Sequence, residues 1–118
     1  MTGRNPEEYL PLTEAMFHVL VTLADGDKHG YVILKEVETR TAGQVQLSTG
    51  TLYGLIKRLL AEGLIVESRQ RPPAADDDGR RRYYRLTPFG RDVARAEAAR
   101  LQKLVAAARA ASLLPGRI

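Results

Sequence analysis

A chain of 118 residues that is 44% hydrophobic and 27% charged has the size and composition of one globular domain, with room for one protruding element. It contains no cysteine, which excludes disulfides and thiolate metal sites, and its apolar runs are too short to cross a bilayer. The net charge of +4 is unevenly distributed: residues 1–47 carry −3, residues 48–91 carry +4 and residues 92–118 carry +3.

The beginning of the chain shows no export signal. Glu7 and Glu8 stand where a signal peptide needs an apolar run. We therefore expect a cytoplasmic protein with no membrane partner.

The first predicted helix covers residues 14–24 and is capped by Thr13. Its body is apolar almost all round, which predicts that more than one side of it is covered. In so small a domain we expect one cover to be a second subunit, with Phe17 and Leu20 at the contact. His18 in this setting is typical of a core or interface histidine rather than of a metal ligand or a pH switch.

A second helix is predicted at residues 30–40, because apolar side chains recur on one face and a glycine follows its end. The segment 44–46 after it is short enough to form one edge strand.

The third predicted helix begins after Ser48, a suitable N-cap, and closes at Gly63. At 100° per residue its side chains separate into two faces. The inner, apolar face consists of Leu52, Leu55, Ile56 and Leu59. The outer face consists of Gly50, Tyr53, Gly54 and Lys57, with Arg58 at its flank.

A β-hairpin is predicted next, from two β-compatible runs at residues 64–69 and 81–86. The sequence between them, QRPPAADDDGR, is rich in turn residues. By alternation Tyr84 and Leu86 face the core, and Tyr83 and Arg85 lie on the opposite face.

The last predicted helix runs from Pro88 to about Ser112, with Thr87 as its cap. Small and apolar side chains recur along it at heptad spacing, which is typical of a helix that packs on another helix. Glu97 interrupts this seam. It either pairs with Arg100 or a partner's lysine at the margin, or it is a buried polar residue that fixes dimer register.

These elements predict a mainly α fold with a small β-hairpin: a winged helix-turn-helix at residues 1–87 and a C-terminal dimerisation helix and tail at residues 88–118. The residues predicted at the dimer interface are Phe17, Leu20, Ala94, Glu97, Leu101, Leu104 and Ala108.

The outer face of the third helix favours DNA binding. A major groove about 12 Å wide admits one helix, and glycines let its backbone come close. Glycine costs about 1 kcal/mol against alanine in an exposed helix, so two on one face need a reason. An ordinary exposed surface is the alternative interpretation.

Arginines gather on the hairpin, and arginine-bearing ribbons contact phosphates or enter the minor groove. Against this, Asp76, Asp77 and Asp78 in the same loop would repel DNA, and a solvated charged hairpin is the alternative. The residues predicted to contact DNA are Lys28, His29, Tyr31, Ser48, Thr49, Gly50, Thr51, Tyr53, Gly54, Lys57, Arg58, Arg80, Arg81 and Arg82.

Catalysis finds little support, because there is no glycine-rich phosphate loop and no nucleophile motif. Two histidines without cysteine or a carboxylate cluster make a poor metal site, so we expect neither a metal nor a cofactor.

Three segments resemble the PadR family of transcriptional regulators, and they occur in the family's order. They are HGYVILKEVE at 29–38, LSTGTLYGLIKRLLAEGLI at 47–65 and RRYYRLTPFGR at 81–91. The resemblance implies a homodimeric winged helix that binds a pseudo-palindromic operator, usually to repress. It also implies that Ser48 to Lys57 form the recognition helix and that Tyr31 lies in a turn near the DNA backbone.

The chain departs from the family at two places. Thr49 stands where proline is frequent, which should be tolerated, and the loop RPPAADDDG is long and acidic, which puts its groove contacts in doubt. Some family members bind aromatic compounds between subunits through aromatic side chains. The last helix here has neither Trp nor Tyr, so the sequence does not support a ligand of that kind.

We therefore expect a homodimeric repressor that binds a double-stranded DNA operator. Two other interpretations stay open. In one, the winged helix is a protein-interaction module, which the acidic loop favours. In the other, it is a ligand-responsive multidrug-type regulator with a small-molecule effector of unidentified class.

Overall fold

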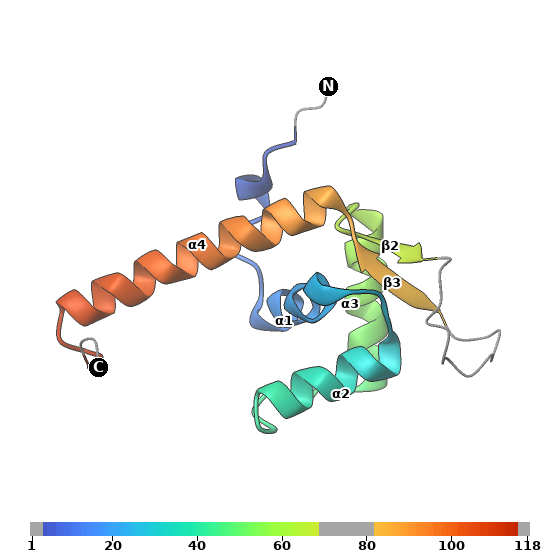
Figure 1. Ribbon diagram of the computed structural model, residues 1–118, viewed down its shortest axis with the longest axis horizontal. Helices are drawn as coiled ribbons and strands as arrows, with labels where there is room; N and C mark the ends of the chain where they lie inside the picture. Colours follow the sequence, from blue (N-terminus) through green and yellow to red (C-terminus); the bar gives the residue numbers. More distant parts are fainter. Residues whose placement is uncertain (1–3, 69–81, 116–118) are drawn as a thin grey trace.

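The computed structural model describes residues 4–68 and 82–115. Within these residues, helices α1 (Glu14–Thr22), α2 (Gly30–Arg40) and α3 (Thr49–Ala61) surround a small core, and the longer α4 (Pro88–Ala110) extends away from it (Figure 1). Two short 3-10 turns, η1 (Pro6–Tyr9) and η2 (Leu23–Asp25), lie before and after α1. The predicted fold, a mainly helical winged helix with a long C-terminal helix, is confirmed.

Hydroxyl side chains start three of the helices, as predicted. Thr13 accepts the amide of Met16 at 3.1 Å, and Ser48 accepts that of Thr51 at 3.0 Å. Thr87 accepts the amide of Gly90 at 2.8 Å. Each cap supplies an acceptor to a helix N–H that has no partner within the helix, which stabilises the helix by about 1 kcal/mol.

A three-stranded antiparallel sheet forms the wing base, in the order β1-β3-β2. The strands are β1 (Lys28–His29), β2 (Ile65–Ser68) and β3 (Tyr83–Leu86). The edge strand next to β3 is therefore the short β1 before α2. The predicted strand at residues 44–46 is wrong.

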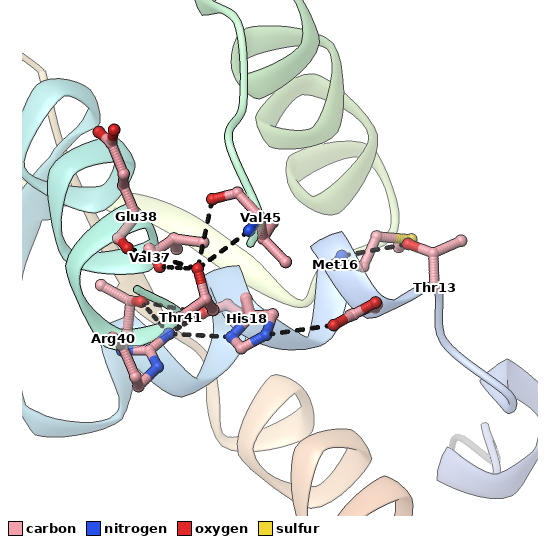
Figure 2. Close-up of polar contacts among 10 residues, drawn as sticks. Thr13, Met16, His18, Val37, Glu38, Arg40, Thr41 and Val45 are labelled. Atoms are coloured by element: carbon pink, nitrogen blue, oxygen red, sulfur yellow. Dashed lines mark hydrogen bonds and ion pairs between the residues drawn. The ribbon is translucent and has the colours of Figure 1, made fainter. Parts of the chain in front are cut away.

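Figure 2 shows the contact between Thr41 and Val45 that helps to keep residues 44–46 out of the sheet. The backbone N–H of Val45 donates to the hydroxyl of Thr41 at 3.0 Å, and that of Gln44 donates to the carbonyl of Thr41 at 3.0 Å. These amides close the turn between α2 and α3 and are not available for a ladder. Arg40, at the end of α2, ties this turn to α1 by donating to the carbonyl of His18 at 3.1 Å and the hydroxyl of Thr22 at 2.8 Å.

The core lies between α1, α2, α3 and the inner face of the sheet. The predicted inner face of α3 is confirmed at Leu52, Ile56 and Leu59, which are buried, while Leu55 is half-buried. Each fully buried side chain of this size contributes roughly 1.5–3 kcal/mol. The other buried apolar residues of this core are Met16, Val19, Leu20, Leu23, Ile33, Val37, Leu64, Ile65, Tyr84, Leu86 and Val93.

The first turns of α4 pack on this core. Val93 is fully buried, and a Cβ on Gly90 would meet the backbone of Leu64. The hydroxyl of Thr87 donates to the carbonyl of Gly63 at 2.7 Å. The division into units at residues 87 and 88 stays a prediction, but the start of α4 belongs to the body.

Candidate nucleic-acid interface

The outer face of α3 exposes its glycines. A Cβ added to Gly50 or Gly54 would meet no atom within 4 Å, and neither residue has a positive φ. Nothing within the described fold requires glycine at these two positions. The helix backbone can therefore be approached closely from outside along this face, as the sequence predicts.

Tyr53 lies on the same face and is partly fixed by the body. Its side chain is 46% exposed, and its ring covers Gly30 at the start of α2, where a Cβ would lie 2.8 Å from Cζ of Tyr53. Gly30 thus makes room for the tyrosine. This contact orients the hydroxyl end of Tyr53 at the junction of α2 and α3.

Basic side chains of α3 lie in two different directions. Lys57 is exposed on the face of Gly50 and Gly54. Arg58 instead turns toward Glu62, with its Nε 3.6 Å from Oε2, and lines a hollow beside the N-terminal segment. We therefore leave Arg58 out of the proposed DNA-binding surface.

The N-terminus of α3 presents its first residues to solvent. Thr49 and Thr51 are exposed, and Ser48 is exposed as well. The hydroxyl of Ser48 is engaged within the helix start, because it caps Thr51 and donates to the Thr51 hydroxyl at 2.9 Å.

Lys28, predicted to touch phosphate, is engaged inside the protein. Its Nζ donates to the carbonyl of Thr22 at 2.7 Å, to Asp25 at 2.6 Å and to Glu36 at 3.0 Å. Burial works against the charged form, but the hydrogen bonds to both carboxylates outweigh it, so the pKa of Lys28 lies above its ordinary value. We therefore leave Lys28 out of the proposed surface.

The neighbours of Lys28 take different positions. His29 is half-buried, with its ring edge-to-face on Tyr83 at a centroid distance of 5.3 Å. Tyr83 is itself buried, although alternation correctly put it on the face opposite Tyr84. Tyr31 on α2 is 64% exposed, with Nζ of Lys35 6.0 Å from its ring centroid.

Of the three wing arginines that the sequence predicts to contact DNA, Arg82 lies within the described residues. Arg82 is exposed and lies 3.6 Å from Glu67 on β2. Arg80 and Arg81 lie outside the described residues, as does the acidic loop.

Arg85 forms an ion pair that the sequence did not reveal. Its Nη2 lies 3.1 Å from Oδ2 of Asp27, and the hydroxyl of Ser68 donates to the same carboxylate. The hydrogen bonds from Arg85 hold the pKa of Asp27 below its ordinary value, against the effect of burial. The signal was absent from the local sequence, because the partners are 58 residues apart and meet only through strand register.

The residues predicted at the dimer interface divide into three groups. Leu20 and Glu97 are buried within the protomer, and we remove them from the proposed interface. Phe17, Ala94 and Leu101 line shallow grooves beside α1 and α4. Beyond them α4 is exposed, with Leu104 at 55% and Val105 at 38%, and Ala108 is half-buried.

Glu97 holds the N-terminal segment against α4. Its carboxylate accepts from Arg100 at 2.6 and 3.0 Å and from the backbone N–H of Leu12 at 3.2 Å. The predicted pairing with Arg100 is confirmed, but Glu97 is buried rather than at the margin. The contact with Leu12 was not foreseen. Hydrogen bonds from Arg100 lower the pKa of Glu97, burial opposes this, and the Leu12 amide adds to it.

Replacing Glu97 with glutamine should lower stability by about 2 kcal/mol at neutral pH, because a buried charge-assisted contact is lost. The pKa of Glu97 is lower in the folded state, so its contribution to stability is present above the ordinary pKa of about 4.5 and is lost as pH falls through the folded pKa. Thermal unfolding of both proteins across the acidic range should show a flatter pH profile for Glu97→Gln. Glu8→Gln, at an exposed site, is the control. Parallel profiles for Glu97→Gln and wild type would refute this role.

The N-terminal segment also contacts the C-terminal end of α3. The sequence did not predict this contact. Arg4 donates to the carbonyl of Glu62 at 2.6 Å and lies over the ring of Phe89 at 4.1 Å from its centroid. Tyr9 packs edge-to-face on Phe89 at 5.4 Å. A cation at a helix C-terminus stabilises the unpaired carbonyls there.

A metal cluster and a membrane-spanning helix are both absent from residues 4–68 and 82–115. These residues contain no group of three acidic, histidine or cysteine side chains placed to hold a metal ion. None of their helices is both long enough and apolar enough to span a membrane.

Most of the segment that forms these helices and the wing base matches a known protein family. Residues 19–96 match the family described as the transcriptional regulator PadR-like family. The chain belongs to this family. PadR proteins are transcriptional regulators and not enzymes.

Curated relatives are uncharacterized proteins. The chain is 38% identical over 91 residues to a protein in a transposon of Streptomyces fradiae, which covers 77% of this chain and 24% of that protein. It is 32% identical over 73 residues to a protein of Lysinibacillus sphaericus, covering 62% of this chain and 64% of the other. The chain therefore spans less than two thirds of either relative.

Solved PadR structures share the fold. A PadR family transcription regulator from Clostridium difficile has a TM-score of 0.66 at 25% identity, covering 80% of this chain and 94% of that one. A transcriptional regulator from Clostridium thermocellum has a TM-score of 0.64 at 26% identity, covering 83% of this chain and 87% of that one. PadR from Bacillus subtilis, solved in complex with operator DNA, has a TM-score of 0.59 at 20% identity, covering 73% of this chain and 47% of that one. At this identity the match shows similarity of fold alone.

Proposed function

We propose that this PadR protein is a cytoplasmic homodimer that binds a pseudo-palindromic DNA operator and represses transcription. The observation that carries the proposal is the outer face of α3. Gly50 and Gly54 leave open space above the helix backbone, and Tyr53 and Lys57 flank it. A helix with this profile fits the major groove, where close backbone approach lets neighbouring side chains reach base edges.

The solved complex of Bacillus subtilis PadR with operator DNA supports the same use of the fold. In a winged helix, the helix enters the groove and the ribbon beside it contacts the backbone. Arg82 is exposed and directly precedes β3, and we assign it this second role.

The dimer part of the proposal depends on α4. Its far half leaves the body (Figure 1). In the single chain Leu104 and Val105 stay exposed on this half. Exposed apolar side chains in a row on a helix favour a second copy as cover. Two recognition helices about 34 Å apart would then match half-sites one DNA turn apart. Sedimentation should give twice the chain mass of 13.1 kDa, and a monomer at micromolar concentration would contradict the dimer.

Lys57→Ala should weaken binding to the upstream region of the protein's own gene by about fivefold or more, since a base or phosphate contact is lost. If the contact is to phosphate, the slope of affinity against salt should also fall by about one unit. Fluorescence anisotropy across a salt series measures both. Lys103→Ala on α4, which removes the same charge from an exposed site, is the matched control and should have little effect.

The same measurements also distinguish DNA binding from the alternative role, in which the winged helix binds another protein. Equal binding by Lys57→Ala and wild type would refute this placement of the DNA surface. No binding by wild type at low salt, or equal binding to random duplex, would favour a protein as the partner of the winged helix.

A further inference from the structure

Three side chains on the outer face of the sheet connect all of its strands. Asp27 directly precedes β1 and stands opposite Arg85 of β3, since the next pair in register is Lys28 with Tyr84. Arg85 donates from Nε to Oδ1 and from Nη2 to Oδ2 of Asp27, both at 3.1 Å. Ser68 of β2 donates its hydroxyl to Oδ2. We call Asp27, Arg85 and Ser68 the wing clamp.

The wing clamp supplements a weak stretch of backbone pairing. β1 has only two residues, and a ladder this short contributes little by itself. A bidentate guanidinium–carboxylate pair fixes both distance and direction between its partners. The clamp therefore sets how β2 and β3 lie relative to β1.

Lys28, the next residue after Asp27, faces the opposite side of the strand and binds the body. Its contacts reach the carbonyl of Thr22 at the end of α1 and Glu36 on α2. Two consecutive residues at the start of β1 thus hold different parts of the molecule: Lys28, in the strand, holds the helices, and Asp27, just before it, holds the hairpin strands. β1 is the connector between the helix-turn-helix and the wing base.

We propose that Asp27 is a positioning residue for DNA binding: through Arg85 and Ser68 it orients the β2–β3 base so that Arg82 reaches the DNA that α3 contacts. This inference rests on the proposed function. It assigns Arg85 to the clamp rather than to phosphate. It also gives a carboxylate a favourable role in binding a polyanion, which is the opposite of its direct electrostatic effect.

The proposal is testable because the two effects of Asp27 on DNA affinity have opposite signs. Removing a carboxylate raises the net charge by one, and by charge alone this strengthens binding to DNA. If Asp27 positions the wing, its removal weakens binding instead. Asp92 provides the matched control, because it is an exposed aspartate on α4 outside the sheet.

The experiment uses the full chain and the tightest duplex recovered from a random-sequence library. Asp27→Ala should bind this duplex about fivefold to tenfold more weakly, whereas Asp92→Ala should bind it equally or slightly more tightly. Arg82→Ala should weaken binding in the wild-type background and have little further effect on Asp27→Ala. Such non-additivity is expected when two residues act through one element.

Each outcome decides a separate point. Tighter or unchanged binding by Asp27→Ala, or additive losses with Arg82→Ala, overturns the positioning role. If wild type binds no duplex from the library, the proposed function itself fails, and this inference fails with it. Thermal unfolding checks that each variant is folded at the assay temperature. If Asp27→Ala is not folded, Asp27→Asn, which keeps the side-chain shape, takes its place in the same comparison.

Discussion

Replacing Gly90 with alanine should destabilise the protein by about 3 kcal/mol or more, which corresponds to a fall of roughly 10 °C in the thermal midpoint. A Cβ at this position would lie 2.8 Å from the carbonyl carbon of Leu64, 3.1 Å from its Cα and closer still to its oxygen. All of these are backbone atoms, so no side-chain rotation can relieve the overlap. The start of α4 would have to move away from Leu64.

That movement would also break neighbouring contacts. Thr87 donates its hydroxyl to the carbonyl of Leu64 at 3.1 Å and its backbone N–H to the same oxygen at 3.1 Å. Calorimetry or thermal circular dichroism measures the change. A midpoint within about 2 °C of wild type would show that the crossing of α4 over Leu64 is looser than the structure indicates.

The same substitution at Gly54 should have the opposite effect on stability. Gly54 lies inside α3 with open space around it, so alanine should stabilise the helix by about 1 kcal/mol. Gly50, in the first turn, should gain less. Gly54→Ala is thus the matched control for Gly90→Ala: one methyl group added to a helical glycine, with the sign decided by what lies next to it.

On the proposed function, the more stable protein should be the weaker DNA binder. Methyl groups at Gly50 and Gly54 would hold the α3 backbone away from the groove, and the double variant should lose about tenfold or more in affinity for its operator duplex. Anisotropy titration and thermal unfolding of the same preparation measure both quantities. Higher stability with unchanged affinity would show that the two glycines do not face DNA.

Sequence patterns predicted the helices well because their determinants are local. Hydroxyl caps at Thr13, Ser48 and Thr87 and the apolar stripe of α3 act within a few residues, and each is found where expected. The prediction of a strand at residues 44–46 was wrong, because a hydrogen-bonded turn forms there instead. Three polar and β-branched residues are compatible with a strand, but the backbone N–H groups of Gln44 and Val45 donate to the carbonyl and the hydroxyl of Thr41 in a turn.

The candidate site was predictable in part. The exposed face of α3 follows from helical periodicity alone, so Gly50, Tyr53, Gly54 and Lys57 needed no structure to be singled out. Periodicity could not show that Tyr53 rests on Gly30, because that contact joins two helices. The sequence likewise predicted a DNA contact for Lys28, whereas its partners lie on three different elements.

By itself the sequence determined the order of the helices, their caps, the outward face of α3 and the membership in the PadR family. Only the tertiary structure decided which charged and small residues serve the fold. Glu97 meets Leu12 across 85 residues, and Asp27 meets Arg85 across 58. Position 90 requires glycine because the backbone of Leu64 leaves no room for a Cβ. Periodicity and capping depend on neighbours along the chain, whereas these contacts depend on strand register and on how one helix crosses another, which no local pattern specifies.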